Sequence, residues 1–303
     1  MVMKVKKISI KRIVVLVLAI IVIIISILFF KNLASDSRAL RKIGYEKQEI
    51  TVILDKLSDN YLAIILDMEY QEKLVDILNE KYYLSKNFEK YLAFLQDNQD
   101  KSTNDIIAIV NVGAYKPWYE DTKLTDLNKG YSMLVNKFNR LSDDYDPGDL
   151  VNISNQYAYE NHIMKEEAYS SYVRMWRAAN DEDLVLIVNS SYRTFQQQKN
   201  EHDRAGDGYA ARPGHSEHQT GLALDIVTYD IIGNAFEETD EFRWLINNAH
   251  KYGFILRYPK GKEYLTGYNY ESWHYRYLGV DLASKVFESG LTFDEYYAFY
   301  LDN

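Results

Sequence analysis

Apolar residues recur three or four positions apart through much of the first half of the chain. This spacing gathers apolar side chains on one face of a helix, so it predicts short amphipathic helices between residues 35 and 104. The recurring positions are Ile50, Val52, Ile53 and Leu57, followed by Leu74, Ile77 and Leu78. No group of reactive side chains accompanies them. We therefore interpret residues 35–130 as a helical accessory region or stalk, with a partner-binding module as the alternative.

From residue 106 onward, β-branched runs alternate with helical patterns. The expected helices cover residues 166–180, 195–201 and 242–252, with further helices in residues 282–301. The expected strands cover residues 106–112, 184–188, 222–228, 254–258 and 273–277. Thr194 and Gln197 have the spacing of a capping box at a helix start, and Gly253 suits a helix end. The pattern predicts a domain of mixed helices and strands over residues 131–303.

A long apolar run, residues 13–30, stands near the amino terminus and contains one serine. About 18 to 20 apolar residues suffice to cross a bilayer as a helix. Five basic residues precede the run, and such residues stay on the cytoplasmic side. We expect residues 1–34 to be a cytoplasmic basic tail and a transmembrane anchor. The chain would then be a single-pass protein of the cell membrane, with everything after Lys31 outside. A signal peptide cleaved within residues 32–35 is the alternative.

The net charge of the chain is −9, although its first twelve residues carry five basic side chains and no acid. The remainder is therefore near −14. A surface of this sign does not attract polyanions, and we expect no nucleic acid as a partner. The chain has no cysteine, so disulfides are excluded. An exported domain of this kind depends on its apolar core and any bound metal for stability.

Two short stretches some fifty residues apart contain candidate metal ligands. His218 and Asp225 lie in the first stretch, and His274 lies in the second. Strand alternation puts Asp225 on the face opposite Leu224, and a carboxylate buried there needs a cation. Three protein ligands with an open fourth position are typical of a catalytic zinc. We therefore expect one catalytic Zn²⁺ bound by these three residues, and attack of activated water on an amide.

Glu271 lies three positions before His274, so a flat strand would put their side chains on opposite faces. A bulge or turn at Ser272 would bring both toward the metal. Glu271 would then take a proton from water and pass it to the leaving amine. Arg193 follows an expected strand and is a candidate for holding an anionic substrate, whereas Trp273 would form a wall of the site.

Several blocks of the sequence resemble the VanY-type D-alanyl-D-alanine carboxypeptidases, which belong to the LAS metallopeptidases. The blocks are Ser190-Ser191-Tyr192-Arg193, the Ser-x-His-x-x-Gly-x-Ala-x-Asp pattern from Ser216 to Asp225, and Glu271-Ser272-Trp273-His274. The resemblance covers residues 134–301. It implies an α+β fold with a small antiparallel central sheet flanked by helices.

The resemblance also implies a role for each candidate residue. The implied zinc ligands are His218, Asp225 and His274, and the implied catalytic residues are Glu271 as base and Arg193 at the oxyanion. The implied substrate-binding residues are Ser216, Arg193, Gln197, Gln198 and Trp273. The implied substrate is a peptidoglycan stem peptide, from which the enzyme would remove the C-terminal D-alanine outside the cell.

Other functions remain open at this point. The motifs do not encode stereochemistry, so an L,D-carboxypeptidase or an endopeptidase acting on peptidoglycan peptides fits as well. A non-catalytic wall-binding module is a further alternative, although binding alone does not require a proton carrier such as Glu271. A membrane sensor is disfavoured because the cytoplasmic segment has only about a dozen residues.

Overall fold

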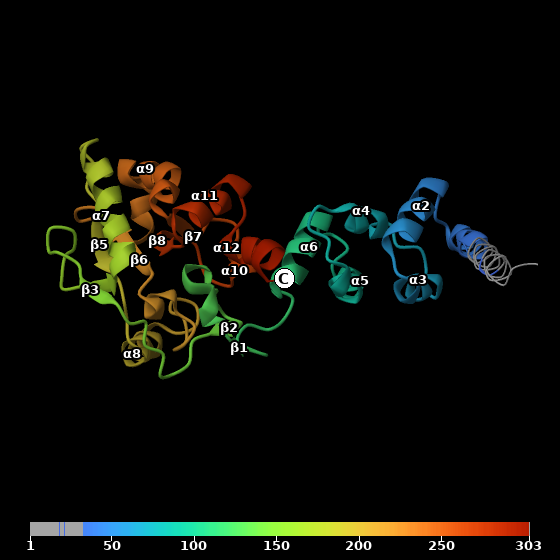
Figure 1. The fold of residues 1–303 in the computed structure, drawn as a ribbon, viewed down its shortest axis with the longest axis horizontal. Helices are drawn as coiled ribbons and strands as arrows, with labels where there is room; N and C mark the ends of the chain where they lie inside the picture. Colours follow the sequence, from blue (N-terminus) through green and yellow to red (C-terminus); the bar gives the residue numbers. More distant parts are fainter. Residues whose placement is uncertain (1–17, 19–20, 22–32, 303) are drawn as a thin grey trace, which may run out of the picture. The chain divides into compact units, whose positions relative to one another are not determined.

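The computed structural model describes residues 18, 21 and 33–302 (Figure 1). The expected basic tail and nearly all of the expected membrane anchor, residues 13–30, lie outside the described residues. None of the described helices combines the length and the apolar character that crossing a bilayer requires. The chain divides into two compact units between Ile107 and Ala108.

The first unit consists of short helices, as the apolar spacing predicts. They are a helix over the described residues 33–43, followed by α2 (Lys47–Lys56), α3 (Asp59–Leu66), α4 (Leu74–Asn79), the 3₁₀ helix η1 (Ser85–Asn87) and α5 (Phe88–Asp97). Their apolar faces meet in one core, in which Ile53, Leu74 and Phe88 are fully buried. The predicted amphipathic helices are therefore confirmed for this part of the chain.

The expected strand over residues 106–112 is wrong, because these residues belong to helix α6 (Thr103–Val112). The side chain of Ser102 accepts a hydrogen bond from the backbone N–H of Asp105, which satisfies a free donor in the first turn of the helix. The residues that follow are apolar on every side, and periodicity does not separate a buried helix from a buried strand in so short a run.

A four-stranded antiparallel sheet forms the centre of the second unit, in the order β5 (Ile187–Ser190), β6 (Ala223–Val227), β8 (Glu271–Tyr277) and β7 (Phe254–Tyr258). The antiparallel central sheet is therefore confirmed, although β5 starts three residues later than expected. Two small sheets accompany it. In one, β1 (Lys123–Leu124) pairs with β2 (Asn139–Arg140), and in the other, β3 (Leu150–Asn152) pairs with β4 (Ile163–Lys165).

Helix α7 (Glu166–Asn180) covers one face of this sheet and lies along β5 and β6 in Figure 1. Tyr172 and Met175 of α7 share a core with Leu224 of β6 and Tyr275 of β8. Side chains alternate along a strand, so Asp225 and His274 belong to the opposite face. The carboxylate and the imidazole are thereby kept away from the apolar core.

The remaining helices complete the second unit. They are α8 (Phe195–Ala205), η3 (Glu217–Thr220), η4 (Gly233–Glu238), α9 (Asp240–Asn248), η5 (Ala249–Tyr252), α10 (Glu263–Thr266), α11 (Val280–Ser289), α12 (Phe293–Tyr296) and the π-helical turn η6 (Tyr297–Leu301), with a further 3₁₀ turn η2 at Leu127–Ser132. The capping box of Thr194 and Gln197 is present at the start of α8. Gly253 ends η5 in a left-handed conformation, as expected.

Candidate active site

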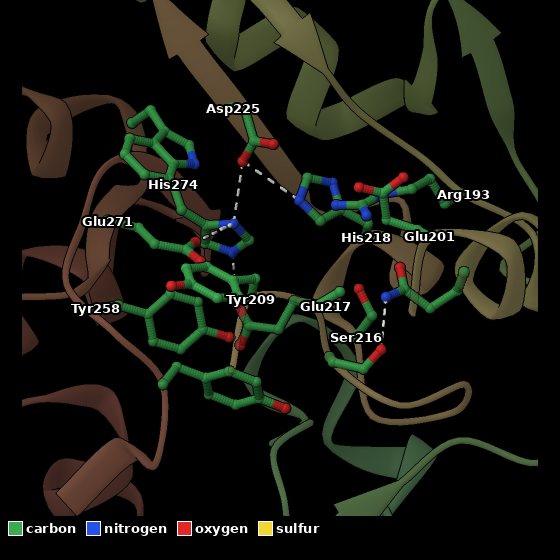
Figure 2. Close-up of a pocket in the computed structure, with 15 residues that line it drawn as sticks. Arg193, Glu201, Tyr209, Ser216, Glu217, His218, Asp225, Tyr258, Glu271 and His274 are labelled. Carbon is green, nitrogen blue, oxygen red and sulfur yellow. Dashed lines mark hydrogen bonds and ion pairs between the residues drawn. The ribbon is translucent and has the colours of Figure 1, made fainter. Parts of the chain in front are cut away.

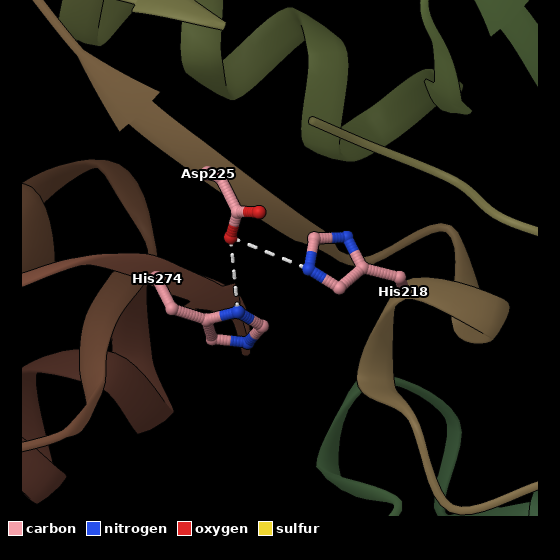
Figure 3. A group of neighbouring side chains, drawn as sticks. All are labelled: His218, Asp225 and His274. Carbon is pink, nitrogen blue, oxygen red and sulfur yellow. Dashed lines mark hydrogen bonds and ion pairs between the residues drawn. The ribbon is translucent and has the colours of Figure 1, made fainter. Parts of the chain in front are cut away.

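The side chains of His218, Asp225 and His274 converge on one point (Figure 3). Asp225 Oδ1 lies 3.1 Å from His274 Nδ1 and 3.3 Å from His218 Nε2. One ligand atom from each residue lies within 4.8 Å of the others. Ligands about 2.1 Å from a tetrahedral zinc stand roughly 3.4 Å from one another, so the two measured distances fit such an ion.

The local fold explains this convergence. Asp225 and His274 are direct partners across the β6–β8 ladder, and their side chains therefore lie on one face of the sheet. His218 lies in the 3₁₀ turn η3, which ends at Gly221 with φ +69°. A Cβ at Gly221 would approach Leu150 Cδ2 to 2.9 Å, so a glycine suits both the conformation and the space. The turn thus brings His218 back toward the strand that it precedes.

Hydrogen bonds fix the orientation of both imidazoles. His218 Nδ1 donates to the backbone carbonyl of Ser191 over 2.6 Å, which leaves Nε2 as the free nitrogen facing Asp225. His274 has the reverse arrangement: Nδ1 faces Asp225, and Nε2 lies 3.3 Å from Glu217 Oε2. A second hydrogen bond of this kind is typical of histidines that bind metals. The donor set and its supports therefore fit a divalent ion such as zinc.

The charges in the site suit a cation as well. Burial alone would raise the pKa of Asp225, but the neighbouring histidines outweigh it and hold this pKa well below its usual range. Burial, reinforced by the charge of Arg193, lowers the pKa of His218 to about 4, so its imidazole is neutral. Burial alone would lower the pKa of His274, but hydrogen bonds with Asp225 and Glu217 raise it to about 9. The surroundings of His274 thus favour positive charge.

Glu271 reaches the same point through a bulge in β8. Leu256 pairs with Tyr275, and Tyr258 pairs with Glu271, so one residue of β7 faces three residues of β8 between these pairs. The extra residues rotate the strand, and Glu271 Oε2 lies 3.6 Å from His274 Nδ1. The bend expected at Ser272 is therefore present. Burial raises the pKa of Glu271 to about 7.

A cavity of about 190 Å³ opens beside these residues (Figure 2). Of the expected substrate contacts, Arg193, Gln198, Ser216 and Trp273 line it. Gln197 does not, because it is exposed and its side chain accepts a hydrogen bond from the Thr194 backbone N–H in the capping box. Within the described part of the chain, Arg193 Nε and Gln198 Oε1 are buried and have no hydrogen-bond partner. Both atoms are therefore available to a ligand.

Several residues of this cavity were not predicted from the sequence. They are Glu201, Tyr209, Glu217, Tyr258 and Tyr268. The sequence does contain evidence that could have pointed to Glu217. This residue adjoins the candidate ligand His218, and two arginines, Arg257 and Arg276, fall within the expected core strands. Charged residues in a core are almost always paired, so a buried acid was to be expected close to these arginines.

Comparison with known proteins identifies the family to which this chain belongs. The family model VanY, described as D-alanyl-D-alanine carboxypeptidase, matches residues 161–280. The bifunctional D-Ala-D-Ala dipeptidase and D-Ala-D-Ala carboxypeptidase VanXYC of Enterococcus gallinarum is 31% identical over 177 residues, which are 54% of this chain and 92% of that protein. The chain belongs to the VanY family of D-alanyl-D-alanine carboxypeptidases.

Two further proteins are similar to this chain. The putative carboxypeptidase YodJ of Bacillus subtilis (strain 168) is 41% identical over 179 residues, which are 54% of this chain and 66% of YodJ, slightly less than two thirds. The solved structure of the LdcB LD-carboxypeptidase, described with its peptidoglycan recognition, has a TM-score of 0.56 at 36% identity and covers 59% of this chain and 91% of that one.

Proposed function

We propose that this chain is a zinc D,D-carboxypeptidase that removes the C-terminal D-alanine from peptidoglycan stem peptides outside the cell. The observation that carries the proposal is the convergence of His218, Asp225 and His274 at a cavity that Glu271 also lines. Membership of the VanY family supports the reaction class. The names of the relatives support the peptidoglycan substrate.

In this proposal His218, Asp225 and His274 hold one Zn²⁺. When bound, zinc makes water a nucleophile near neutral pH and polarises a carbonyl. Asp225 supplies the anionic oxygen, and the backbone carbonyl of Ser191 accepts from Nδ1 of His218, which leaves its Nε2 for the ion. The three side chains leave space on the cavity side, where a scissile amide can approach.

Glu271 is the general base in this mechanism. Its carboxylate lies at the edge of the ligand group, 3.6 Å from His274 Nδ1. A pKa raised by burial to about 7 suits a group that must both accept and return a proton near neutral pH. Glu271 takes the proton of the attacking water and delivers it to the amine of the departing D-alanine.

The other cavity residues bind the substrate. Arg193 stabilises either the negative charge that develops on the carbonyl oxygen or the terminal carboxylate of the substrate. Its Nε is the unpartnered donor described above. Gln198 Oε1 accepts from an N–H of the peptide. Ser216 and Trp273 line the same cavity, as a polar contact and as an apolar wall.

The similarity to the LdcB LD-carboxypeptidase favours a second candidate, an L,D-carboxypeptidase acting on tetrapeptide stems. One assay separates the two. The zinc-loaded protein is incubated with pentapeptide and tetrapeptide stems, and the products are weighed by mass spectrometry. Loss of one alanine from the pentapeptide alone supports the D,D activity, and loss from the tetrapeptide alone supports the L,D activity. Intact stems in both reactions contradict both candidates, whereas cleavage of cross-linked stems alone would indicate an endopeptidase.

We also propose that the apolar run of residues 13–30 holds the enzyme at the membrane, with residues 35–130 as a stalk and residues 131–303 as the catalytic domain. The support is the length of the run and the basic residues before it. Removing residues 1–34 should move the protein from the membrane fraction to the soluble fraction after cell lysis. A full-length chain already found in the soluble fraction would contradict the anchor.

A further inference from the structure

Glu217 lies next to one proposed zinc ligand, His218, in the sequence, but its side chain contacts a different one, His274. Its side chain is fully buried. Oε1 accepts hydrogen bonds from Arg257 Nε and Arg276 Nη1, each over 2.8 Å. Oε2 lies 3.3 Å from His274 Nε2. One carboxylate therefore connects two buried guanidinium groups to the imidazole of a metal-ligand candidate.

This contact bears on which nitrogen of His274 keeps a proton when a metal is bound. Nδ1 faces the cavity, with Asp225 Oδ1 at 3.1 Å and Glu271 Oε2 at 3.6 Å. A neutral imidazole binds a metal through its unprotonated nitrogen, so its hydrogen must lie on Nε2. Glu217 Oε2 is an acceptor at that nitrogen. An anionic acceptor also makes the opposite nitrogen a stronger ligand.

The two arginines prevent Glu217 from turning away. Both donate to Oε1, and both are fully buried, so bulk solvent reaches neither guanidinium group. Arg257 is held in turn by Asp294 of α12, and Arg276 donates to the backbone carbonyl of Met133. The carboxylate of Glu217 is thus held by donors on β7 and β8, and each donor is fixed by a further contact of its own.

We propose that Glu217 is a positioning residue, which holds His274 with Nδ1 turned toward the metal and its proton on Nε2. The proposal rests on the zinc site proposed above. The two proposed zinc-ligand histidines are then supported in different ways: His218 by the backbone carbonyl of Ser191 and His274 by a charged side chain. The competing interpretation is that Glu217 only balances the charges of Arg257 and Arg276.

The test compares Glu217→Gln with Glu295→Gln. Glu295 is also buried, pairs with Lys262 at 3.2 Å and accepts a hydrogen bond from the Thr292 backbone, but it contacts none of the proposed ligands. Zinc affinity is measured by competition with a chromophoric chelator, and the visible absorption spectrum is recorded with Co²⁺ in place of zinc. We expect Glu217→Gln to weaken zinc binding by roughly 10- to 100-fold and to alter the Co²⁺ spectrum. Glu295→Gln should change neither.

Equal zinc affinity and an unchanged Co²⁺ spectrum in Glu217→Gln would overturn the positioning role, provided that the unsubstituted protein binds zinc. Failure of the unsubstituted protein to bind zinc would instead overturn the zinc site itself. If Glu217→Gln does not fold, ¹⁵N-histidine NMR of the zinc-loaded unsubstituted protein decides the matter. We expect a slowly exchanging proton on His274 Nε2, and a proton on Nδ1 or rapid exchange at Nε2 would contradict the proposal.

Discussion

Glu271 Oε2 lies 3.6 Å from His274 Nδ1, although the two residues are three positions apart on one strand. The bulge in β8 makes this contact possible, because it places three residues of β8 opposite one residue of β7. The conformation of β8 alone therefore places the proposed base, Glu271, beside the proposed zinc ligand His274. Substitution of Glu271 can therefore test whether it acts as a base and not as a metal ligand.

Glu271→Gln should remove peptidase activity while leaving zinc binding in place. The amide has nearly the same shape but accepts no proton, and loss of a general base commonly lowers the rate by about 10²- to 10⁴-fold. Activity on stem peptides and zinc affinity are measured on the same preparation. The control is Glu160→Gln, a substitution of an exposed glutamate outside the cavity. Unaltered turnover in Glu271→Gln would contradict its assignment as the base.

Arg193→Lys should lower kcat more than it changes zinc affinity. Lysine retains the positive charge but has no counterpart to Nε, the buried donor without a partner in the described structure. Loss of one donor at a developing oxyanion lowers kcat by roughly 10²- to 10³-fold. Steady-state kinetics on the stem peptide provide the check. A rise in KM with kcat unchanged would indicate that Arg193 only binds the substrate ground state.

Removal of zinc should destabilise the second unit. A ligand present at a thousand times its Kd stabilises a folded protein by about 4 kcal/mol. For a unit of this size, that corresponds to a change in Tm of roughly 8 to 16 °C. Thermal unfolding is followed with and without a chelator, and zinc is then restored. Asp225→Ala should abolish the difference between the two conditions. A Tm that does not respond to the chelator in the unsubstituted protein would argue against a tightly bound ion.

Features that depend on local sequence were the ones that could be predicted for this site and its fold. Asp225 stands on a strand among apolar neighbours, so its charge was informative before any contact was known. β7 was predicted with its observed bounds, because a short run of large residues, apolar except for Arg257, lies between Gly253 and Pro259. Helix α6 was predicted as a strand because residues 106–110 are all apolar, and so short an apolar run has no period that separates a helix from a strand.

Long-range pairing accounts for what the sequence did not supply. Glu217, Arg257 and Arg276 are separated by up to 59 residues along the chain, and their local sequence does not state which acid meets which base. Gln197 and Gln198 are neighbours of the same type, yet one caps a helix and the other lines the cavity. Which of them faces the site depends on the orientation of α8, and that orientation is a tertiary property.

Gly221→Ala should lower the stability of the second unit and weaken zinc binding together. Gly221 has φ +69°, and an added Cβ would meet Leu150 Cδ2 at 2.9 Å and Lys165 Cγ at 3.2 Å. Strain of this kind costs about 1 to 3 kcal/mol. Since Gly221 ends the turn that carries His218, relief of the strain would displace this ligand. Chemical denaturation and chelator competition measure the two effects. Gly290→Ala is the control, because Gly290 has the same left-handed backbone conformation (φ +68°) but no atom within 4 Å of the added Cβ.

His215 should make the protein less stable at mildly acidic pH. The side chain is buried, and its Nδ1 donates to the Asn136 carbonyl over 2.8 Å. Burial lowers the pKa of His215 below 6.5, and the charges of Arg140, Arg212 and Lys137 act in the same direction, against the opposing effect of the Asn136 hydrogen bond. As the pH falls through 6.5, the unfolded chain therefore takes up a proton before the folded protein does. The free energy of unfolding then decreases until the pH reaches the lower folded pKa.

His215→Gln removes this source of acid sensitivity while leaving a side chain that can still donate to the Asn136 carbonyl. The substitution can lower stability at every pH, so the informative quantity is the difference in unfolding free energy between the two proteins. We expect this difference to shrink between pH 7 and pH 5 as the unsubstituted protein loses stability, by about 1.4 kcal/mol for each unit by which the folded pKa is lowered. Denaturant titrations at several pH values provide the measurement. Two parallel stability curves would mean that His215 has the same pKa in the folded and unfolded chain.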